Sequence, residues 1–372
     1  MQFIDLAAQQ AHMKDALDRR IQTVLAHGRY IMGPEVAELE GALCAYTGAR
    51  HCVTCANGTD AILLALMALG VGEGDAVFVP AFTFAATAEM IPYVGAKTFF
   101  VDVDPRTFNM DANSLESCIA LARDRGLRPA CAIPVDLFGL PADYDAVEKV
   151  ARQNDMRVIG DSAQGFGATY KGRRVGTLGD ISTTSFFPAK PLGCYGDGGA
   201  LFTDNDEWAE LLRSMRFHGK GADKYDNVRL GMNSRLDTLQ AAVLLEKLTI
   251  FDDELAARRS LADRYTAGLG NRLNVPYVPE GLSSAWAQYT IRLPETAGRA
   301  DFRLRLAEAG VPTNVYYPTP LNALTAYAGN ATAPRGVNVS RRLADEVLSL
   351  PMHPYLQPHD QDRVLNAVLD NL

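Results

Sequence analysis

Short apolar runs rich in Val, Ile and Phe alternate with segments of helical pattern between residues 50 and 205. Parallel strands covered on both faces read as near-continuous apolar runs, and each return to the next strand needs a crossover, usually a helix. The alternation therefore predicts an α/β fold whose large domain holds a mostly parallel sheet of seven strands. The expected strands span 52–56, 76–80, 97–102, 130–135, 157–160, 183–187 and 200–203, and the clearest intervening helices span 59–70, 83–94, 113–125 and 144–154.

The pattern changes on either side of this region. Apolar residues recur at spacings of three and four over 15–47, which predicts helix, and Gly33-Pro34 divides that helix into two pieces. With ~150 residues per domain as a prior, we expect two domains, a large one over 1–250 and a smaller C-terminal α+β domain over 251–372. The elements expected near and beyond the boundary are a long helix over 234–265, strand-like runs at 274–278 and 287–293, and helices at 300–309 and 360–371.

The composition of the 372 residues, with 48% hydrophobic and 22% charged, is ordinary for a globular protein and excludes a disordered or collagen-like chain. The formal net charge is −8 without any block of like charge, so nucleic acid and anionic membranes are poor partners. No uninterrupted apolar run reaches the ~18 residues of a membrane-spanning helix. The first twenty residues lack the pattern of a secretory signal. We therefore expect a cytoplasmic protein.

Six cysteines are spread through the chain, and Cys52 and Cys55 form a C-x-x-C pair. A zinc site would need a second pair of ligands at a related spacing, and none follows. Two small apolar residues in a strand are the simpler interpretation. We expect no metal.

Two polar motifs follow expected strands. The segment Asn57-Gly58-Thr59-Asp60 joins a strand to a helix, where backbone N–H groups bind phosphate, although plain helix capping is the simpler explanation. Asp161 stands at the carboxyl end of a buried strand, where α/β proteins place ligand-binding groups. A helix cap or a loop carboxylate explains Asp161 equally well.

Two further motifs carry positive charge. Lys190 lies between Pro188 and Pro191, beside aromatic residues and ahead of a glycine-rich turn. Partial desolvation would lower the pKa of its amine and favour Schiff-base chemistry, against the alternative of a surface lysine that ends a strand. Arg229 and Arg235 lie in a polar loop that leads into a helix, where they could bind phosphate or carboxylate or could simply be solvated.

Together these motifs occur in one order and spacing that resembles a known family. The most specific stretches are Asn57–Asp60, Gly160–Gln164, Ser185–Gly199 and Gly231–Ala242. They resemble the sugar aminotransferases of the DegT/DnrJ/EryC/StrS type, within the fold-type I pyridoxal-phosphate enzymes, and the resemblance covers nearly the whole chain. Some relatives carry His in place of Lys190 and dehydrate the sugar, so the lysine implies amino transfer.

The resemblance implies that pyridoxal 5′-phosphate forms a Schiff base with Lys190, which also moves the proton between cofactor and sugar. Asp161 would face the pyridine nitrogen. The remaining contacts implied for the cofactor are Gln164 to the phenolic oxygen, Phe84 stacked on the ring, and Gly58, Thr59 and Ser185 to the phosphate. Asn233 would reach the phosphate from the neighbouring subunit, so the family pattern implies a homodimer with shared active sites.

The resemblance also implies two substrates, L-glutamate as the amino donor and a nucleotide-linked keto sugar as the acceptor. The phrases around Lys190 and Asn233 look most like the branch that aminates C3 of UDP-2-acetamido-2-deoxy-3-keto-glucuronic acid, for surface polysaccharide such as O-antigen. A diphosphate and a uronic acid need local cations. Candidates for the substrate pocket are Arg229, which could meet the sugar carboxylate, Arg235, His218 and Tyr317, with Lys220 as a further cation.

Two alternatives remain open on the sequence. The acceptor could be a dTDP- or GDP-linked 3-keto or 4-keto hexose, with the same mechanism. The chain could instead be a non-catalytic regulator that binds the cofactor, although retention of Lys190, Asp161 and Gln164 argues against that. Relatives often have His where this chain has Asn322, which puts substrate contacts from that loop in doubt.

Overall fold

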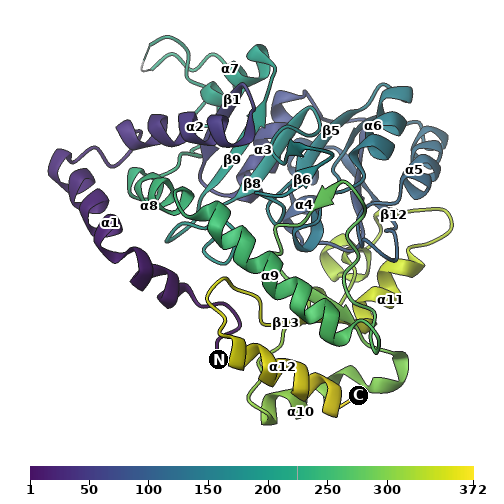
Figure 1. Cartoon of the computed structure of the whole chain (residues 1–372). Coiled ribbons are helices and arrows are strands. Elements are labelled where there is room, and N and C mark those ends of the chain that lie inside the picture. The colour runs from purple at the N-terminus through teal and green to yellow at the C-terminus, as the bar shows by residue number, and fades with distance from the viewer. Residues whose placement is uncertain (224) are drawn as a thin grey trace.

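The fold is that of a computed structural model, which describes residues 1–223 and 225–372. Its centre is a sheet of eight strands in the order β1-β9-β8-β5-β4-β2-β3-β12 (Figure 1). Neighbouring strands are parallel except where β9 pairs with β1 and β8. The strands are β1 (His51–Cys55), β2 (Asp75–Pro80), β3 (Lys97–Val101), β4 (Arg128–Ala132), β5 (Arg157–Asp161), β8 (Ile181–Ser185), β9 (Gly199–Thr203) and β12 (Ala331–Thr332).

The α/β class and the seven expected strands are confirmed, but the count of seven is wrong. The eighth strand, β12, pairs with the edge strand β3 and comes from a part of the chain expected to lie in the smaller domain. Only two residues long, β12 is too short for a periodicity to be visible in the sequence. Leu321, Tyr327 and Val337 around it also pack into the core of the large sheet. The division of the chain at residue 250 stays a prediction.

Strand β2 shows why both faces of the sheet are covered. Side chains alternate along a strand, so Val77 and Val79 enter one core while Ala76 and Phe78 enter the other. The first core is closed by α3 (Gly58–Ala68) and α7 (Asp206–Met215), and the second by α5 (Ala112–Asp124) and α6 (Tyr144–Gln153), which lie side by side in Figure 1.

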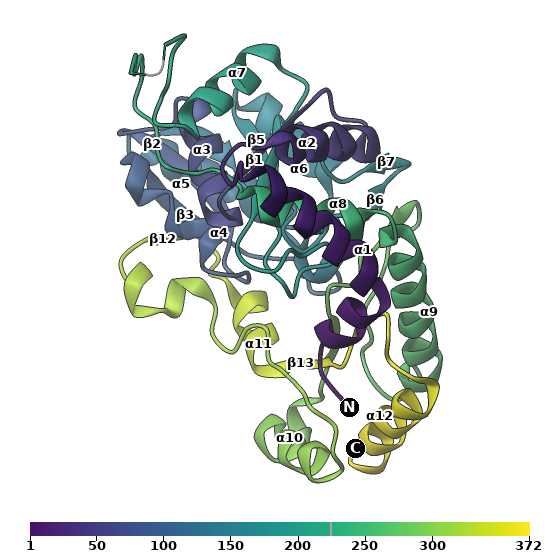
Figure 2. The same cartoon turned by 90° about the vertical axis from the view of Figure 1, so that its left-hand side faces the viewer.

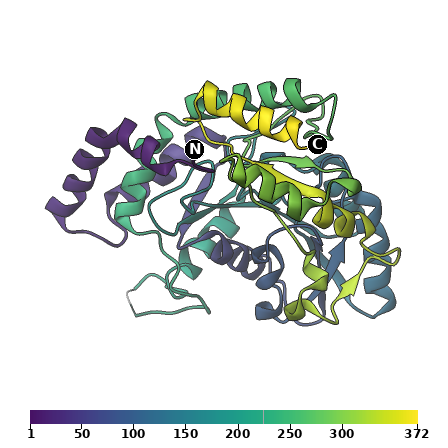
Figure 3. The same ribbon diagram turned by 90° about the horizontal axis from the view of Figure 1, so that it is seen from below.

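The two N-terminal helices, α1 (Leu6–His27) and α2 (Pro34–Thr47), form a layer with the later helices α8 (Thr238–Leu248) and α9 (Phe251–Leu269). The helices α1 and α2 are separated at Gly33-Pro34, as expected, and both pack against α8. Figure 3 shows α1 reaching away from the rest of the chain. The single helix expected over 234–265 is instead two, α8 and α9. The Thr249 hydroxyl donates to the Glu246 carbonyl at 2.6 Å and competes with the helical pattern, while acidic residues open α9.

The C-terminal part builds a core of its own. Strands β11 (Tyr289–Arg292) and β13 (Val347–Leu350) pair antiparallel, and α9, α10 (Arg299–Glu308) and α12 (Pro358–Asp370) close around them. The helices α9 and α12 contact each other and lie side by side in Figure 3. The run 274–278 is not a strand, because only Asn274 pairs with a neighbour, Arg292. The other elements in this part are α11 (Asn338–Glu346), η3 (Glu295–Ala297), η4 (Leu321–Ala323) and η5 (Thr325–Tyr327).

The remaining elements are short. The helix expected over 83–94 is two brief turns, α4 (Ala86–Glu89) and η1 (Pro92–Val94), because Pro92 cannot donate the hydrogen bond that would continue α4. Within the described residues, no helix is both long and apolar enough to cross a membrane. A small three-stranded sheet is formed by β6 (Thr169–Tyr170), β7 (Arg173–Arg174) and β10 (Leu282–Ser283), and η2 (Leu137–Gly139) follows β4.

Candidate active site

A pocket opens where several parallel strands end. The strands β1, β2, β5 and β8 run in one direction, so their carboxyl ends, and the residues that follow them, meet at one edge of the sheet. The cavity measures about 390 Å³, within the range usual for small-molecule sites. Eight of the residues that the sequence proposed line it together, namely Gly58, Thr59, Phe84, Asp161, Gln164, Ser185, Lys190 and Tyr317.

Lys190 lies in the loop between β8 and β9. Its backbone amide donates to the Phe187 carbonyl at 2.8 Å, which turns the chain so that the lysine side chain lines the pocket. The surrounding protein desolvates the ammonium and lowers the pKa of Lys190, and the negative charge of Asp161 partly opposes that shift. A lowered pKa leaves more of the amine neutral and nucleophilic at neutral pH.

Asp161 is the last residue of β5 and is almost fully buried. Its Oδ2 accepts a hydrogen bond from the Thr87 hydroxyl at 2.7 Å, and its Oδ1 accepts one from the Ala163 amide at 3.2 Å. Burial raises the pKa of Asp161, while these two donors and the charge of Lys190 act in the opposite direction. The site therefore holds a carboxylate that is costly to bury and available to pair with a positive charge.

An anion-binding cradle forms at the start of α3. The backbone amides of Gly58 and Thr59 lie in the first helical turn, where no intrahelical carbonyl can reach them. The Asn57 side chain caps the helix by accepting from the Asp60 amide at 2.8 Å. A Cβ on Gly58 would lie 2.7 Å from the Cβ of Ser185, so only glycine lets the serine hydroxyl approach these amides.

Gln164 and Tyr317 form a wall of the pocket. The Gln164 Oε1 accepts from the Phe138 amide at 2.8 Å, and its Nε2 donates to the Tyr317 hydroxyl at 3.2 Å. The ring of Phe84 lies 6.1 Å from that of Tyr317 and is more than half exposed. Burial raises the pKa of Tyr317, so its hydroxyl stays protonated and can donate onward.

The other proposed residues lie elsewhere in this chain. The described residues of the segment 217–233 project from the sheet (Figures 1 and 2), and Asn233 is exposed at the end of that segment. His218 lies in the same segment, with a positive φ of 60°. Arg229 donates to the Ser214 hydroxyl, and Arg235 stacks over the Phe217 ring at 4.6 Å.

A second cavity of about 740 Å³ is lined by basic residues, among which Arg229 and Lys220 are candidates from the sequence. Arg213, Arg216, Lys220 and Arg229 line it, with Glu210 as the acidic member. Arg216 is already paired with Glu40. This cavity and the pocket around Lys190 share no lining residue. Within a single chain, the basic groups of this cavity therefore lie apart from the candidate catalytic groups around Lys190.

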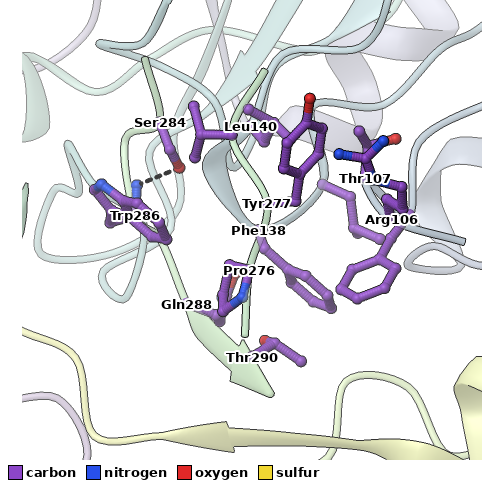
Figure 4. Close-up of a pocket in the computed structure, with 13 residues that line it drawn as sticks. Arg106, Thr107, Phe138, Leu140, Pro276, Tyr277, Ser284, Trp286, Gln288 and Thr290 are labelled. Atoms are coloured by element: carbon purple, nitrogen blue, oxygen red, sulfur yellow. Dashed lines mark hydrogen bonds between the residues drawn. The ribbon is translucent and has the colours of Figure 1, made fainter. Parts of the chain in front are cut away.

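Sequence reasoning missed several residues of the pocket. Thr87 gave no signal, because a threonine in an alanine-rich segment does not reveal that its hydroxyl faces a carboxylate. Gln288 is a polar residue between Ala287 and Tyr289 in a strand-like run, a signal that was present. It lines both the pocket and a small cavity of about 20 Å³ (Figure 4), and no partner for its Oε1 is found among the described residues. Ile4 and Tyr316 also line the pocket.

The cysteine pair takes no part in this site. Cys52 and Cys55 are buried in β1, and burial raises the pKa of both thiols, so they are unreactive at neutral pH. In the described part of the chain, no three His, Cys, Asp or Glu side chains gather in a way that could hold a metal ion.

Comparison with known proteins gives the family. The DegT/DnrJ/EryC1/StrS aminotransferase family matches residues 11–369. A curated relative from Pseudomonas aeruginosa, UDP-2-acetamido-2-deoxy-3-oxo-D-glucuronate aminotransferase, is 48% identical over 96% of both chains. Among solved structures, a DegT/DnrJ/EryC1/StrS aminotransferase from Brucella abortus is 50% identical with a TM-score of 0.97, covering 100% of this chain and 99% of its own.

A second solved structure bears on the chemistry. DesV from S. venezuelae, determined in complex with a ketimine intermediate, is 36% identical with a TM-score of 0.93, and the match covers 99% of this chain and 97% of that one. The matches extend over almost the whole length of each protein, so they concern the complete fold and the pocket within it. The chain belongs to the DegT/DnrJ/EryC1/StrS aminotransferase family.

Proposed function

We propose that this aminotransferase moves an amino group from L-glutamate to C3 of UDP-2-acetamido-2-deoxy-3-keto-glucuronic acid, a step toward surface polysaccharide such as O-antigen, in the cytoplasm. The observation that carries the proposal is the meeting of Lys190, Asp161 and the α3 cradle in one pocket. The identity of 48% over almost the full length of the Pseudomonas aeruginosa enzyme supports the choice of sugar.

The pocket fits pyridoxal 5′-phosphate. It offers an amine of lowered pKa, a buried carboxylate and a cradle of backbone amides, which match the aldehyde, the pyridine nitrogen and the phosphate of that cofactor. When bound, pyridoxal phosphate supplies a ring that withdraws the electron pair left on a carbon that loses its proton. Gly58, Thr59 and Ser185 would hold the phosphate, Gln164 the phenolic oxygen, and Phe84 the face of the ring.

The side chains of this chain then have distinct tasks. Lys190 Nζ would hold the cofactor covalently, and its free amine would take the proton from the donor carbon and return one to the sugar carbon. The Asp161 carboxylate would keep a proton at the ring nitrogen, and Thr87 orients that carboxylate. Tyr317, bonded to Gln164, keeps the pocket wall in place beside Phe84 and can donate to substrate.

The acceptor sugar is tested directly with a panel. The purified protein is incubated with nitrogen-15-labelled L-glutamate and UDP-linked 3-keto-N-acetylhexosamines with and without the C6 carboxylate. The same incubation uses dTDP- and GDP-linked 3-keto and 4-keto hexoses. We expect label in the UDP uronic acid product, with kcat/KM at least about tenfold above the uncharged sugar, because a charge-assisted hydrogen bond contributes that much. Preference for a dTDP or GDP sugar would replace the proposed substrate, and no transfer to any sugar would favour a regulator.

A homodimer with shared active sites would bring the separated groups together. Asn233 is exposed and outside the lining of its own pocket, as a residue that serves a neighbouring subunit would be. Large apolar side chains are exposed near the pocket and on the projecting segment, which is typical of a surface that a second copy covers. They include Phe84 and Phe187 in the lining of the pocket and Leu230 on the projecting segment.

Mixed dimers test this arrangement. Lys190→Ala and Asn233→Ala subunits are each expected to give weakly active dimers. If Asn233 serves the partner, mixing them by mild unfolding and refolding produces dimers with one intact site, and activity should recover to about one quarter of wild type. Two copies of the same variant, taken through the same treatment, are the control. Activity no greater than the sum of the separate variants would place Asn233 in the site of its own chain.

A further inference from the structure

The loop that carries Lys190 is folded tightly on itself. The amide of Cys194 donates to the Phe186 carbonyl at 2.8 Å, and the Lys190 amide donates to the Phe187 carbonyl at the same distance. A Cβ on Gly193 would lie 2.5 Å from the Pro188 carbonyl oxygen, so the two sides of the turn are in direct contact. The backbone position of Gly193 therefore constrains the position of the segment that contains Lys190.

Helix α8 holds this turn through two side chains. The Lys247 ammonium donates to the Gly193 carbonyl at 2.7 Å, and the Gln240 Oε1 accepts from the Tyr195 amide at 2.8 Å. Gln240 and Lys247 are seven residues apart, which places them on one face of the helix, two turns from each other. Both attach to the three residues 193–195, which begin three positions after Lys190.

Lys247 is an unusual residue for its place. Only 1% of it is exposed, although lysine is almost never buried without a partner. Its ammonium lies 4.2 Å from the centre of the Tyr195 ring, and the charge of Glu254 on α9 is close enough to favour the charged form. Burial nevertheless lowers the pKa of Lys247 to about 8. A methionine would fill this space without that cost, so packing alone does not account for a lysine.

We propose that Lys247 is a positioning residue, whose ammonium fixes the Gly193 carbonyl and thereby aims Lys190 into the pocket, with Gln240 as the second anchor. The inference rests on the proposed role of Lys190 as the reacting amine. Lys247 lines neither the pocket nor the basic cavity, so it acts through the turn and does not touch substrate. Loss of the anchor should change the chemistry at Lys190 and leave substrate affinity alone.

The test compares Lys247→Met and Lys247→Arg in the full-length holoenzyme. Methionine keeps the stem and removes the donor, whereas arginine keeps a charged donor. The measurements are kcat, KM for both substrates, the pH titration of the visible absorption of the bound cofactor, and thermal unfolding. We expect Lys247→Met to lower kcat about tenfold or more, with KM within about twofold and a shifted titration. Lys247→Arg should recover part of kcat. Lys149→Met, on the exposed face of α6, is the matched control.

The pH dependence of kcat is a second test, because a residue that only stabilises the fold would not change it. Neutralising the Lys247 ammonium weakens its hydrogen bond, so the wild-type kcat should decline above pH about 8, the pKa of this group. The groups that face it are Glu254 on α9 and Cys194 and Tyr195 on the loop, and burial keeps the thiol of Cys194 protonated to about pH 11. Lys247→Arg should move this decline to higher pH.

The outcomes separate the inference from the proposed function. A Lys247→Met enzyme with wild-type kcat and titration would overturn the positioning role, even if it unfolds at a lower temperature. If that variant does not fold, Gln240→Leu decides, because it removes the other anchor and must then lower kcat with the same spectral shift. If the wild-type protein never binds pyridoxal phosphate at Lys190, the proposed function fails irrespective of these variants.

Discussion

Replacing Lys190 with alanine is expected to abolish amino transfer, with kcat/KM lower by at least about 10³-fold. The amine is the only group in the described pocket whose lowered pKa suits both covalent attachment and proton transfer. The side chain only lines the pocket, so its removal should leave the fold and the phosphate cradle intact. Steady-state transfer from glutamate to the preferred sugar measures the loss, and the unfolding temperature should stay close to that of wild type.

Lys149→Ala, an exposed lysine on α6, is the control for the loss of a positive charge and should behave as wild type. Substantial turnover by Lys190→Ala would show that another group attaches the cofactor or moves the proton. The proposed mechanism would then have to be abandoned, although family membership would stand.

Replacing Asp161 with asparagine is expected to reduce kcat by about 10²–10⁴-fold, because the side chain keeps its shape but loses the charge that holds a proton at the ring nitrogen. Thr87 and the Ala163 amide can still pair with an amide side chain, so the geometry of β5 should persist. Asp145→Asn, an exposed carboxylate on α6, is the matched control. A kcat within a few fold of wild type would remove Asp161 from the chemistry.

The pH dependence of cofactor binding follows from the same group. Burial raises the pKa of Asp161 above the usual range of an aspartate. The carboxylate is charged above that pKa and neutral below it, so the affinity of cofactor-free protein for pyridoxal phosphate should fall as pH drops through the raised pKa. The Asp161→Asn variant has no carboxyl group at this position to titrate. Equilibrium dialysis across this pH range should therefore show that the affinity of the variant for pyridoxal phosphate does not fall as the pH drops.

Local rules were enough for seven of the eight strands of the sheet and for the edge at which the pocket lies. Strands such as β2 are apolar on both faces because both faces are buried, and that burial is visible in the sequence as Val77, Phe78 and Val79 in a row. The carboxyl ends of parallel strands meet at one edge, so Asp161 and Ser185 were expected at the same edge, and the structure shows that their strands β5 and β8 are neighbours. The assignment of their roles came from the resemblance to a family and stays a prediction.

Contacts between distant segments were not predictable in the same way. The break between α8 and α9 coincides with a hydroxyl, that of Thr249, which donates to the Glu246 carbonyl and so competes with a helical amide for that acceptor, against a continuous apolar stripe. Thr87 and Asp161 are 74 residues apart, and Lys247 and Gly193 are 54 apart, so no spacing rule connects them. The separation of Arg229 from the pocket of its own chain was not predicted either, because residue spacing does not show that this segment projects from the sheet.

The central claim is that the pocket at the carboxyl edge of the sheet holds pyridoxal phosphate on Lys190. The most direct measurement is to reduce the purified holoenzyme with borohydride, digest it, and locate the modified peptide by mass spectrometry. We expect modification at Lys190 alone, and we expect excess L-glutamate added before the reductant to prevent it, because the donor would displace that lysine. Modification at another lysine, or none in protein saturated with the cofactor, would contradict this claim.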